Sequence, residues 1–264
     1  MRKTIALLSL LLWSALANAA YTVVQTANTI DAICGSGTAI TATFSSNVGV
    51  GNAIIAMAQW NSATATASVA DNHSNAFTAG PQAYDSVVGN DDEMFVLLNE
   101  GSSTTNAVTI TLTASSGHCG LFIMEVSGLT TSGTGVAFST NTGMPLVNPG
   151  SDPISTNSLA NPTSNASIFV GLGSDNNKNG TGMVPAGAGT SLAGLGTNPF
   201  NWKESGDTQN YRNGQYQRIT SGGSYQSQFN SGASYDRFNM LSVIVNESGG
   251  GAPANNTPLL TWPR

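Results

Sequence analysis

Charged residues are scarce in this sequence. Asp, Glu, Lys and Arg make up 8% of its 264 residues, whereas about 25% is usual for a globular domain. Eight residues are basic, and the net charge is −6. Proteins that hold nucleic acid or an anionic membrane surface present a basic face. The composition therefore predicts no nucleic-acid partner and no electrostatic attachment to a membrane.

Cysteine is equally scarce, since Cys34 and Cys119 are the only two. Neither belongs to a CxxC pair or to another spacing that is typical of metal sites. In an oxidising compartment an isolated pair most simply forms a disulfide. We expect a disulfide between Cys34 and Cys119, with two buried free thiols as the alternative.

Only one long apolar run occurs, from Ile5 to Leu16. It is too short to span a bilayer, and no other stretch approaches the ~18 apolar residues that a transmembrane helix needs. Arg2 and Lys3 precede the run, and the small-x-small sequence Ala17-Asn18-Ala19 follows it. This order is typical of a cleaved signal peptide. We therefore predict a signal peptide over 1–19 and export to the periplasm, the cell surface or the medium.

The rest of the chain shows the two-residue period of β-strands. Val108, Ile110 and Leu112 alternate with threonines, which suits a strand with one buried face. Strands are expected at 22–27, 40–44, 53–60, 65–70, 94–98, 107–112, 121–126, 167–172, 215–219, 225–229 and 240–245. Many short strands without a helical period between them predict an all-β fold, an antiparallel β-sandwich of jelly-roll-like form.

The predicted organisation has three parts, of which the signal peptide is the first. One β-sandwich domain is expected over 20–248, because the strands before the Ser127–Ala166 stretch have too few partners to close a core. That stretch is poor in apolar residues and is interpreted as a long connection with one weak strand near Val136–Phe138. A flexible tail is expected over 249–264. Its apolar end, Leu259–Trp262, either docks on the domain itself or mediates self-association.

Motifs in the first half of the chain resemble those of a secreted bacterial β-sandwich family. The family pattern runs from GN and a hydrophobic run to Trp, then to V-x-D-x-x-G-N-x-Y/F and L-x-I-x-E-x-S-G. The matching segments are Gly51–Ala56, Trp60, Val69–Phe77, Asn106–Leu112 and Leu121–Gly128. The resemblance covers about residues 45–130 and implies a β-sandwich in a secreted or surface protein, without implying an activity.

The family's recurring polar positions correspond to Asp71, Asn75 and Glu125, and Ser74 stands where the family has Gly. Asp and Asn cap turns through bonds between side chain and backbone. Glu125 is expected to accept hydrogen bonds from turn amides. We therefore predict structural roles for all three residues.

Calcium binding is suggested by the sequence that follows the predicted strand at 167–172. Asp175, Asn177 and Asn179 precede Gly180 at the spacing that opens a calcium loop. The closing glutamate of such a loop is absent, and Ala186 occupies its position. Calcium is therefore a weak prediction, and no other cofactor is expected. The acidic run Asn90–Glu93 is expected to form a solvated turn before the next strand.

Catalysis has little support in the sequence. None of the signatures G-x-S-x-G or H-E-x-x-H is present. A triad of His73, Asp71 and some serine stays open, since triads assemble in space. Glycoside hydrolysis needs two carboxylates across a cleft, and Glu125 is a single candidate. The expected protein is non-catalytic.

Aromatic residues gather between Phe200 and Phe238 among Asn, Gln, Ser and Gly. Aromatic faces with amide neighbours suit a carbohydrate ligand, and Trp202, Tyr211 and Tyr235 are the candidate binding residues. Tyr216 and Phe229 are expected in the core. The preferred interpretation is a secreted or surface-exposed protein for binding or adhesion, with a glycan as the candidate ligand. The alternatives are a structural subunit of an extracellular assembly and a polysaccharide-acting hydrolase.

Overall fold

The computed structural model describes a molecule built from β-strands. The described residues are 21–31, 39–62, 64–86, 89–116, 118–141, 154–163, 165–175, 183–188, 200–203, 211–219, 222–231 and 238–248. Their single helical element is the 3₁₀ turn η3 (Gly133–Gly135). Within this part of the chain, no helix has the length and apolar character that a membrane crossing requires.

The first half of the chain forms two facing sheets, which we call the first large sheet and the first small sheet. The first large sheet has the strand order β1 (Thr22–Asp31), β9 (Cys119–Ser127), β3 (Ala53–Asn61) and β7 (Asn90–Leu97), with the short strands β5 (Thr78–Ala79) and β6 (Ala83–Asp85) on β7. The first small sheet has the order β2 (Ala39–Thr43), β8 (Ala107–Leu112) and β4 (Ala67–Asp71). All pairings are antiparallel.

The second half repeats this plan. The second large sheet has the order β10 (Val136–Asn141), β19 (Phe238–Asn246), β13 (Ser167–Asp175), β16 (Tyr211–Ile219) and β15 (Phe200–Lys203). The second small sheet has the order β11 (Ile154–Ser155), β18 (Ser227–Ser231) and β14 (Met183–Ala188), and a further ladder joins β12 (Leu159–Ala160) to β17 (Ser224–Tyr225).

The two halves have one topology. The order β1-β9-β3-β7 matches β10-β19-β13-β16, and β2-β8-β4 matches β11-β18-β14. In each half the chain crosses repeatedly between the large and the small sheet, as in a jelly roll, although β5, β6 and β7 follow one another in the first large sheet and β15 and β16 do so in the second. The predicted all-β, jelly-roll-like sandwich is thus confirmed, and the chain contains two such sandwiches in tandem.

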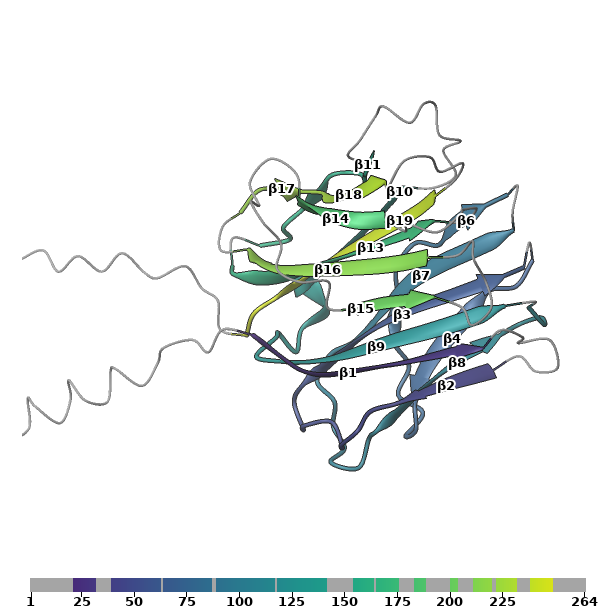
Figure 1. Ribbon diagram of the computed structural model, residues 1–264. Coiled ribbons are helices and arrows are strands. Elements are labelled where there is room, and N and C mark those ends of the chain that lie inside the picture. Colours follow the sequence, from purple (N-terminus) through teal and green to yellow (C-terminus); the bar gives the residue numbers. More distant parts are fainter. Residues whose placement is uncertain are drawn as a thin grey trace, which may run out of the picture.

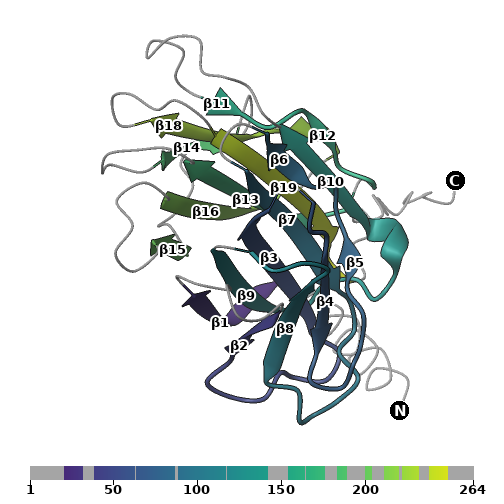
Figure 2. The ribbon, with the colours of Figure 1, turned by 90° about the vertical axis from the view of Figure 1, so that its right-hand side faces the viewer.

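The four main sheets lie in layers, with the two large sheets in the middle (Figures 1 and 2). One apolar core fills the space between the first small and the first large sheet. A second core lies between the two large sheets, and a third lies on the far side of the second large sheet. The argument that the strands before Ser127 cannot close a core is therefore wrong. The second core nevertheless packs the two sandwiches against each other. The predicted domain boundaries, 20–248, stay a prediction.

The number of covered faces explains which strands alternate between buried and exposed residues and which are buried throughout. Every residue of β3 from Ala53 to Trp60 is buried, because its two faces contact two different cores. β8 belongs to an outer sheet, and its buried Val108, Ile110 and Leu112 alternate with more exposed threonines, as predicted. Continuous apolar runs mark strands that are covered on both sides.

The acidic run Asn90–Glu93 corrects a prediction. It forms the first half of β7, and all four residues are buried; the expected solvated turn is wrong. The physical reason is the position of β7 in a large sheet, where the other sandwich covers one face. Asp92 lies on that covered face, and the Asn239 side chain of β19 donates to it at 2.8 Å.

A short sequence repeat accompanies the repeated topology. An Asn-Ala pair stands where β3 begins and directly before β13, at Asn52-Ala53 and Asn165-Ala166. An Ile-x-x-x-Ser-Gly pattern ends the last strand in both halves, at Ile123–Gly128 and Ile244–Gly249. One pattern marks the beginning of a strand and the other marks the end of its antiparallel neighbour, so together they set one alignment between the halves.

The strand register gives the same alignment. Ile54, two residues after Asn52, pairs with Glu125, three residues before Gly128. Ser167 and Asn246 hold the corresponding positions of the second half and also pair with each other. Positions in the first sandwich can therefore be matched to positions in the second, residue by residue, along these strands.

Candidate functional site

The candidate site lies at the end of the first sandwich where β4 turns toward β5. The carboxylate of Asp71 accepts the backbone N–H groups of His73 at 2.8 Å and Asn75 at 2.9 Å, and also the Asn75 side-chain amide at 2.8 Å. Ser74 has φ 65°, the left-handed region that glycine adopts without strain. The predicted turn-capping roles of Asp71 and Asn75 are confirmed.

A second carboxyl group, that of Glu100, lies beneath the surface and contacts the Asp71 carboxylate of this turn. Glu100, which is fully buried, lies in the loop between β7 and β8 and accepts the backbone N–H of Ser102 at 2.7 Å. Burial and a hydrogen bond shared with Asp71 raise the pKa of Glu100. Burial also raises the pKa of Asp71, but hydrogen bonds from Glu100, Asn75 and the turn amides outweigh it, and the net shift is downward. The shared proton therefore belongs to Glu100, and Asp71 is the acceptor.

Asn72 ties the turn to the loop that follows Glu100. Its backbone N–H donates to the carbonyl of Ala107 at 3.0 Å. Its side-chain oxygen accepts the backbone N–H of Asn106 at 3.2 Å. Together with the Asp71–Glu100 pair, these bonds hold two segments that are about thirty positions apart in the chain.

Three polar side chains converge beside this carboxyl pair: His73 and Thr104 are exposed, and Ser102 is half-buried. The His73 Nε2 atom lies 2.9 Å from the Thr104 hydroxyl and 3.0 Å from the Ser102 hydroxyl. The two hydroxyl groups are 3.1 Å apart. Each atom can donate or accept, depending on the ring tautomer and the hydroxyl rotor. The cluster is therefore a compact hydrogen-bonding surface.

The same geometry argues against a catalytic triad. Ser102 and His73 lie at the distance of a nucleophile and its base. Ser102 could therefore be the serine of the triad that the sequence leaves open. Asp71, however, bonds to the backbone of His73 instead of the ring, so it does not orient the imidazole as a triad acid does. The Asp71 and Glu100 carboxyls share a hydrogen bond, which is closer than the ~5–10 Å separation of glycosidase carboxylates.

Glu125 also has the role that its motif predicts. It is fully buried in β9 and accepts the backbone N–H of Gly49 at 2.8 Å. The side-chain amides of Asn52 and Gln25 donate to the same carboxylate at 2.5 Å and 2.6 Å. Glu125 thus ties β1 and the β2–β3 turn to the end of β9, and its structural role is confirmed.

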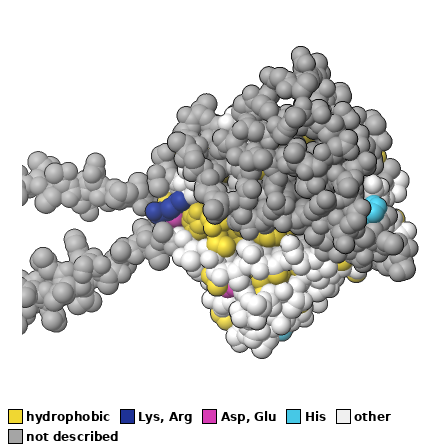
Figure 3. All heavy atoms as spheres, viewed as in Figure 1, with side chains coloured by type: hydrophobic (Ala, Val, Ile, Leu, Met, Phe, Trp, Pro, Cys, Tyr) yellow, Lys and Arg dark blue, Asp and Glu magenta, His cyan; other side chains and the backbone are white. Residues whose placement is uncertain are grey.

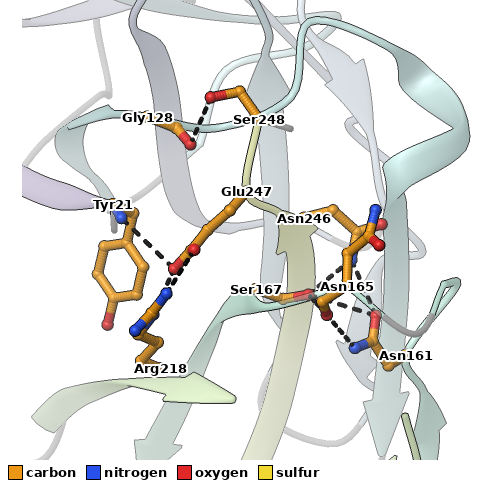
Figure 4. Close-up of polar contacts among 9 residues, drawn as sticks. All are labelled: Tyr21, Gly128, Asn161, Asn165, Ser167, Arg218, Asn246, Glu247 and Ser248. Carbon is orange, nitrogen blue, oxygen red and sulfur yellow. Dashed lines mark hydrogen bonds and ion pairs between the residues drawn. The ribbon is translucent and has the colours of Figure 1, made fainter. Parts of the chain in front are cut away.

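A second polar centre lies where the ends of the two sandwiches meet (Figure 4). Glu247 is buried and receives Arg218 through two bonds of 2.5 Å and 2.7 Å. The backbone N–H of Tyr21 donates to the same carboxylate at 3.4 Å. Ser248 donates to the carbonyl of Gly128 at 3.0 Å. The centre therefore connects the residue before β1 with the residue after β9 and with the two residues after β19.

The candidate aromatic residues are only partly covered by the structure. Trp202 lies on β15 opposite Arg212 of β16, and Tyr211 lies opposite Lys203 in the next register position. The structure thus places Trp202 and Tyr211 on neighbouring strands. Tyr235 lies outside the described residues. Phe229 is fully buried and Tyr216 packs on the core between the large sheets, as predicted.

The predicted calcium and disulfide residues fall at the border of what is described. Asp175 is the last residue of β13, whereas Asn177 and Asn179 lie outside the described residues. Among the described residues, no group of His, Cys, Asp or Glu has the arrangement of a metal site. Cys119 is buried in β9, opposite Asp31 of β1. Cys34 lies outside the described residues, and the disulfide stays a prediction.

The residues that sequence reasoning missed are Glu100, Ser102 and Thr104. They belong to a loop rich in Gly, Ser and Thr, which the sequence marks only as a turn. No local pattern connects that loop to His73, because the contact depends on how β4 and β8 pair.

Comparisons of the chain with protein-family models, with curated proteins and with solved structures find no match.

Proposed function

We propose that this protein is an exported, non-catalytic binding protein whose ligand is uncharged and rich in hydroxyl groups, such as a glycan. The observation that carries the proposal is the cluster of His73, Ser102 and Thr104. Its three polar atoms lie within 3.1 Å of one another at an exposed loop end. Such a surface offers donors and acceptors at fixed positions, which is what a sugar hydroxyl needs.

The rigidity of the base supports the proposal. Asp71 and Glu100 are buried and bonded to the two segments that carry the cluster. A binding surface held in place before contact loses less entropy when its ligand binds. The low charge of the molecule also favours a neutral ligand over a charged one. Among the atoms that Figure 3 colours by type, few belong to Asp, Glu, Lys or Arg side chains.

The test is a glycan array probed with the secreted protein, followed by titration calorimetry on any ligand found. We expect His73→Ala to reduce affinity about tenfold, because removal of a hydrogen-bonding group costs about 1–2 kcal/mol. Thr66→Ala is the matched control, since Thr66 is an exposed threonine that bonds to Thr113. Unchanged affinity of the His73→Ala protein for every bound glycan would contradict this location.

The aromatic candidates enter the same experiment as a second arm. Trp202→Ala tests the edge of the second large sheet, where β15 is the last strand. A loss of binding in Trp202→Ala with none in His73→Ala would move the proposed site to that edge. A fluorophosphonate probe tests hydrolysis, since labelling of Ser102 would make the protein an enzyme and overturn the non-catalytic proposal.

A further inference from the structure

The two sandwiches differ in a consistent way at matched positions on the inner faces of their large sheets. The alignment set by the repeat pairs Glu125 with Asn246. Continuing along the same registers, Asp91 corresponds to Asn213 and Glu93 to Gln215. At each of these positions the first sandwich has an acid and the second has an amide. An amide has nearly the shape of a protonated carboxyl group but does not titrate.

Asp91 and Glu93 lie side by side in the first sandwich. They are two positions apart on β7 and therefore share a face. Asp91 pairs with Trp60 of β3, and Glu93 pairs with Ala58. The exposed fraction is 0% for Asp91 and 8% for Glu93. The Gln82 side chain donates a hydrogen bond to Asp91.

The surroundings of the pair supply no positive charge among the described side chains. Tyr84 of β6 pairs with Asp91, and Cys119 of β9 lies beside Trp60. The nearest other acids, Asp85 on β6 and Asp92 on β7, occupy the positions that face the second large sheet. Within the described part of the chain, two carboxyl groups thus share a buried site with no cation beside them, and neutralisation by protons reduces the cost of burying them.

The second sandwich shows how the same place is filled without titration. Gln215 is fully buried, and its side-chain amide donates to the Ser227 hydroxyl at 2.5 Å and to the Gln228 carbonyl at 3.2 Å. The amide therefore occupies the interior as a neutral hydrogen-bonding group at every pH in the range of interest.

We propose that the first sandwich is the pH-responsive half of the molecule. Protons on Asp91 and Glu93 hold β7 in the first large sheet under acidic conditions. Their loss weakens the attachment of β7, whereas the second sandwich, with amides at the matched positions, does not respond.

The direction of the effect follows from the titration of the pair. Burial raises the pKa of Asp91 to about 7, and the nearby Asp92 charge adds to this shift. Burial and the Asp91 charge raise the pKa of Glu93 to about 7. The unfolded chain releases these protons near pH 4, so the folded state holds more protons between about pH 4 and pH 7. Stability is therefore highest below this window, falls as the pH rises through it, and levels off above it.

The experiment is hydrogen exchange of the full mature protein at pH 5 and pH 8, corrected for the intrinsic exchange rate at each pH. Peptides over β7 and β16 report on the two halves. We expect protection in β7 to fall at least about tenfold at pH 8, because one proton changes the unfolding equilibrium about tenfold per pH unit. Protection in β16 is expected to stay within about twofold.

The test variants exchange the acid and amide side chains between matched positions of the two halves. Asp91→Asn with Glu93→Gln gives the first sandwich the chemistry of the second, and β7 should then keep its protection at pH 8. Gln215→Glu should give β16 the pH response that it lacks. An equal loss of protection in β7 and β16 of the native protein would overturn the proposal. So would a loss in β7 that persists in the double amide variant.

Discussion

The first sandwich places carboxyl groups where the second places amides, although both halves wind their strands in the same order. Glu125 gathers turn amides through a carboxylate. At the matched position, the Asn246 amide donates to Ser167 at 2.6 Å and to Asn161 at 2.9 Å. Apolar pattern and register are thus sufficient to set the strand order, and the buried polar groups vary as long as each is satisfied.

The largest difference that we expect between the halves concerns covalent linkage. The predicted Cys34–Cys119 disulfide would join two residues of the first half of the sequence and would close a loop of 85 residues (119 minus 34). In the chain-entropy model such a loop is worth about 4–5 kcal/mol. Cys34→Ser with Cys119→Ser should lower the stability of the first sandwich by a similar amount. Urea unfolding with and without reductant measures it.

The control for this prediction is alkylation of the native protein without reductant. Two alkylated cysteines would show that the free-thiol alternative holds. The double serine variant would then lose only the packing of Cys119, and reductant would have no effect on unfolding.

The ion pair of the second sandwich gives the next largest effect. The Glu247 side chain is 1% exposed and that of Arg218 is 42% exposed, and the position of β9 that matches Glu247 is Val126. Arg218→Gln leaves a buried carboxylate without its cation, which should cost about 2–4 kcal/mol at pH 7. Glu247→Gln leaves a cation that water can reach, and it should cost about 1 kcal/mol.

Thermal unfolding at pH 7 tests this asymmetry. At pH 7 the loss in Arg218→Gln should be larger than the loss in Glu247→Gln, because only the first variant leaves a buried charge without its partner. Equal losses in the two variants would show that burial does not decide the cost.

The two sandwiches also differ at one glycine in their interiors, and a substitution there should have a smaller effect on stability. Gly171 of β13 corresponds to Ala58 of β3. A Cβ atom at Gly171 would lie 1.9 Å from the hydroxyl and 2.6 Å from the Cβ of Ser227. Because rotation of Ser227 cannot relieve both contacts, Gly171→Ala should cost about 1–3 kcal/mol.

Ser227→Gly is the compensating change, and it should restore part of the stability of Gly171→Ala in chemical denaturation. The reverse exchange in the first sandwich, Ala58→Gly, should cost about 1 kcal/mol through chain entropy. If Gly171→Ala did not change stability, the second small sheet, which carries Ser227, would lie farther from the second large sheet than the structure places it.

Strands with a simple exposure pattern could be predicted from the sequence. The strand at 107–112 has the predicted bounds, because one face of β8 is buried and the other is not. The strand near Val136–Phe138 extends to Asn141, because it pairs with the buried β19 along its length. Sequence patterns were sufficient where a strand's environment repeats every second residue.

The remaining features depend on contacts between distant segments. Asn90–Glu93 has the composition of a solvated turn, and only the cover from the second sandwich and β6 explains why it is a buried strand. The repeat itself is limited to the Asn-Ala and Ile-x-x-x-Ser-Gly patterns, which are too short to stand out before the register aligns them. The His73 cluster depends on a contact across 29 positions.

The smallest expected effect concerns the turn that carries His73. Ser74 and Asn99 are the described non-glycine residues with positive φ, at 65° and 59°, and both lie in loops of the first sandwich. Ser74→Gly removes the steric cost of a Cβ in the left-handed region but adds chain entropy to the unfolded state. We expect a net gain of at most about 1 kcal/mol, measured by denaturant unfolding. Asn99→Gly should gain less, because Asn tolerates this region better than Ser does. If Ser74→Gly instead lowered stability, the Asp71 cap would depend on the Ser74 side chain, and the turn would be set by more than its backbone.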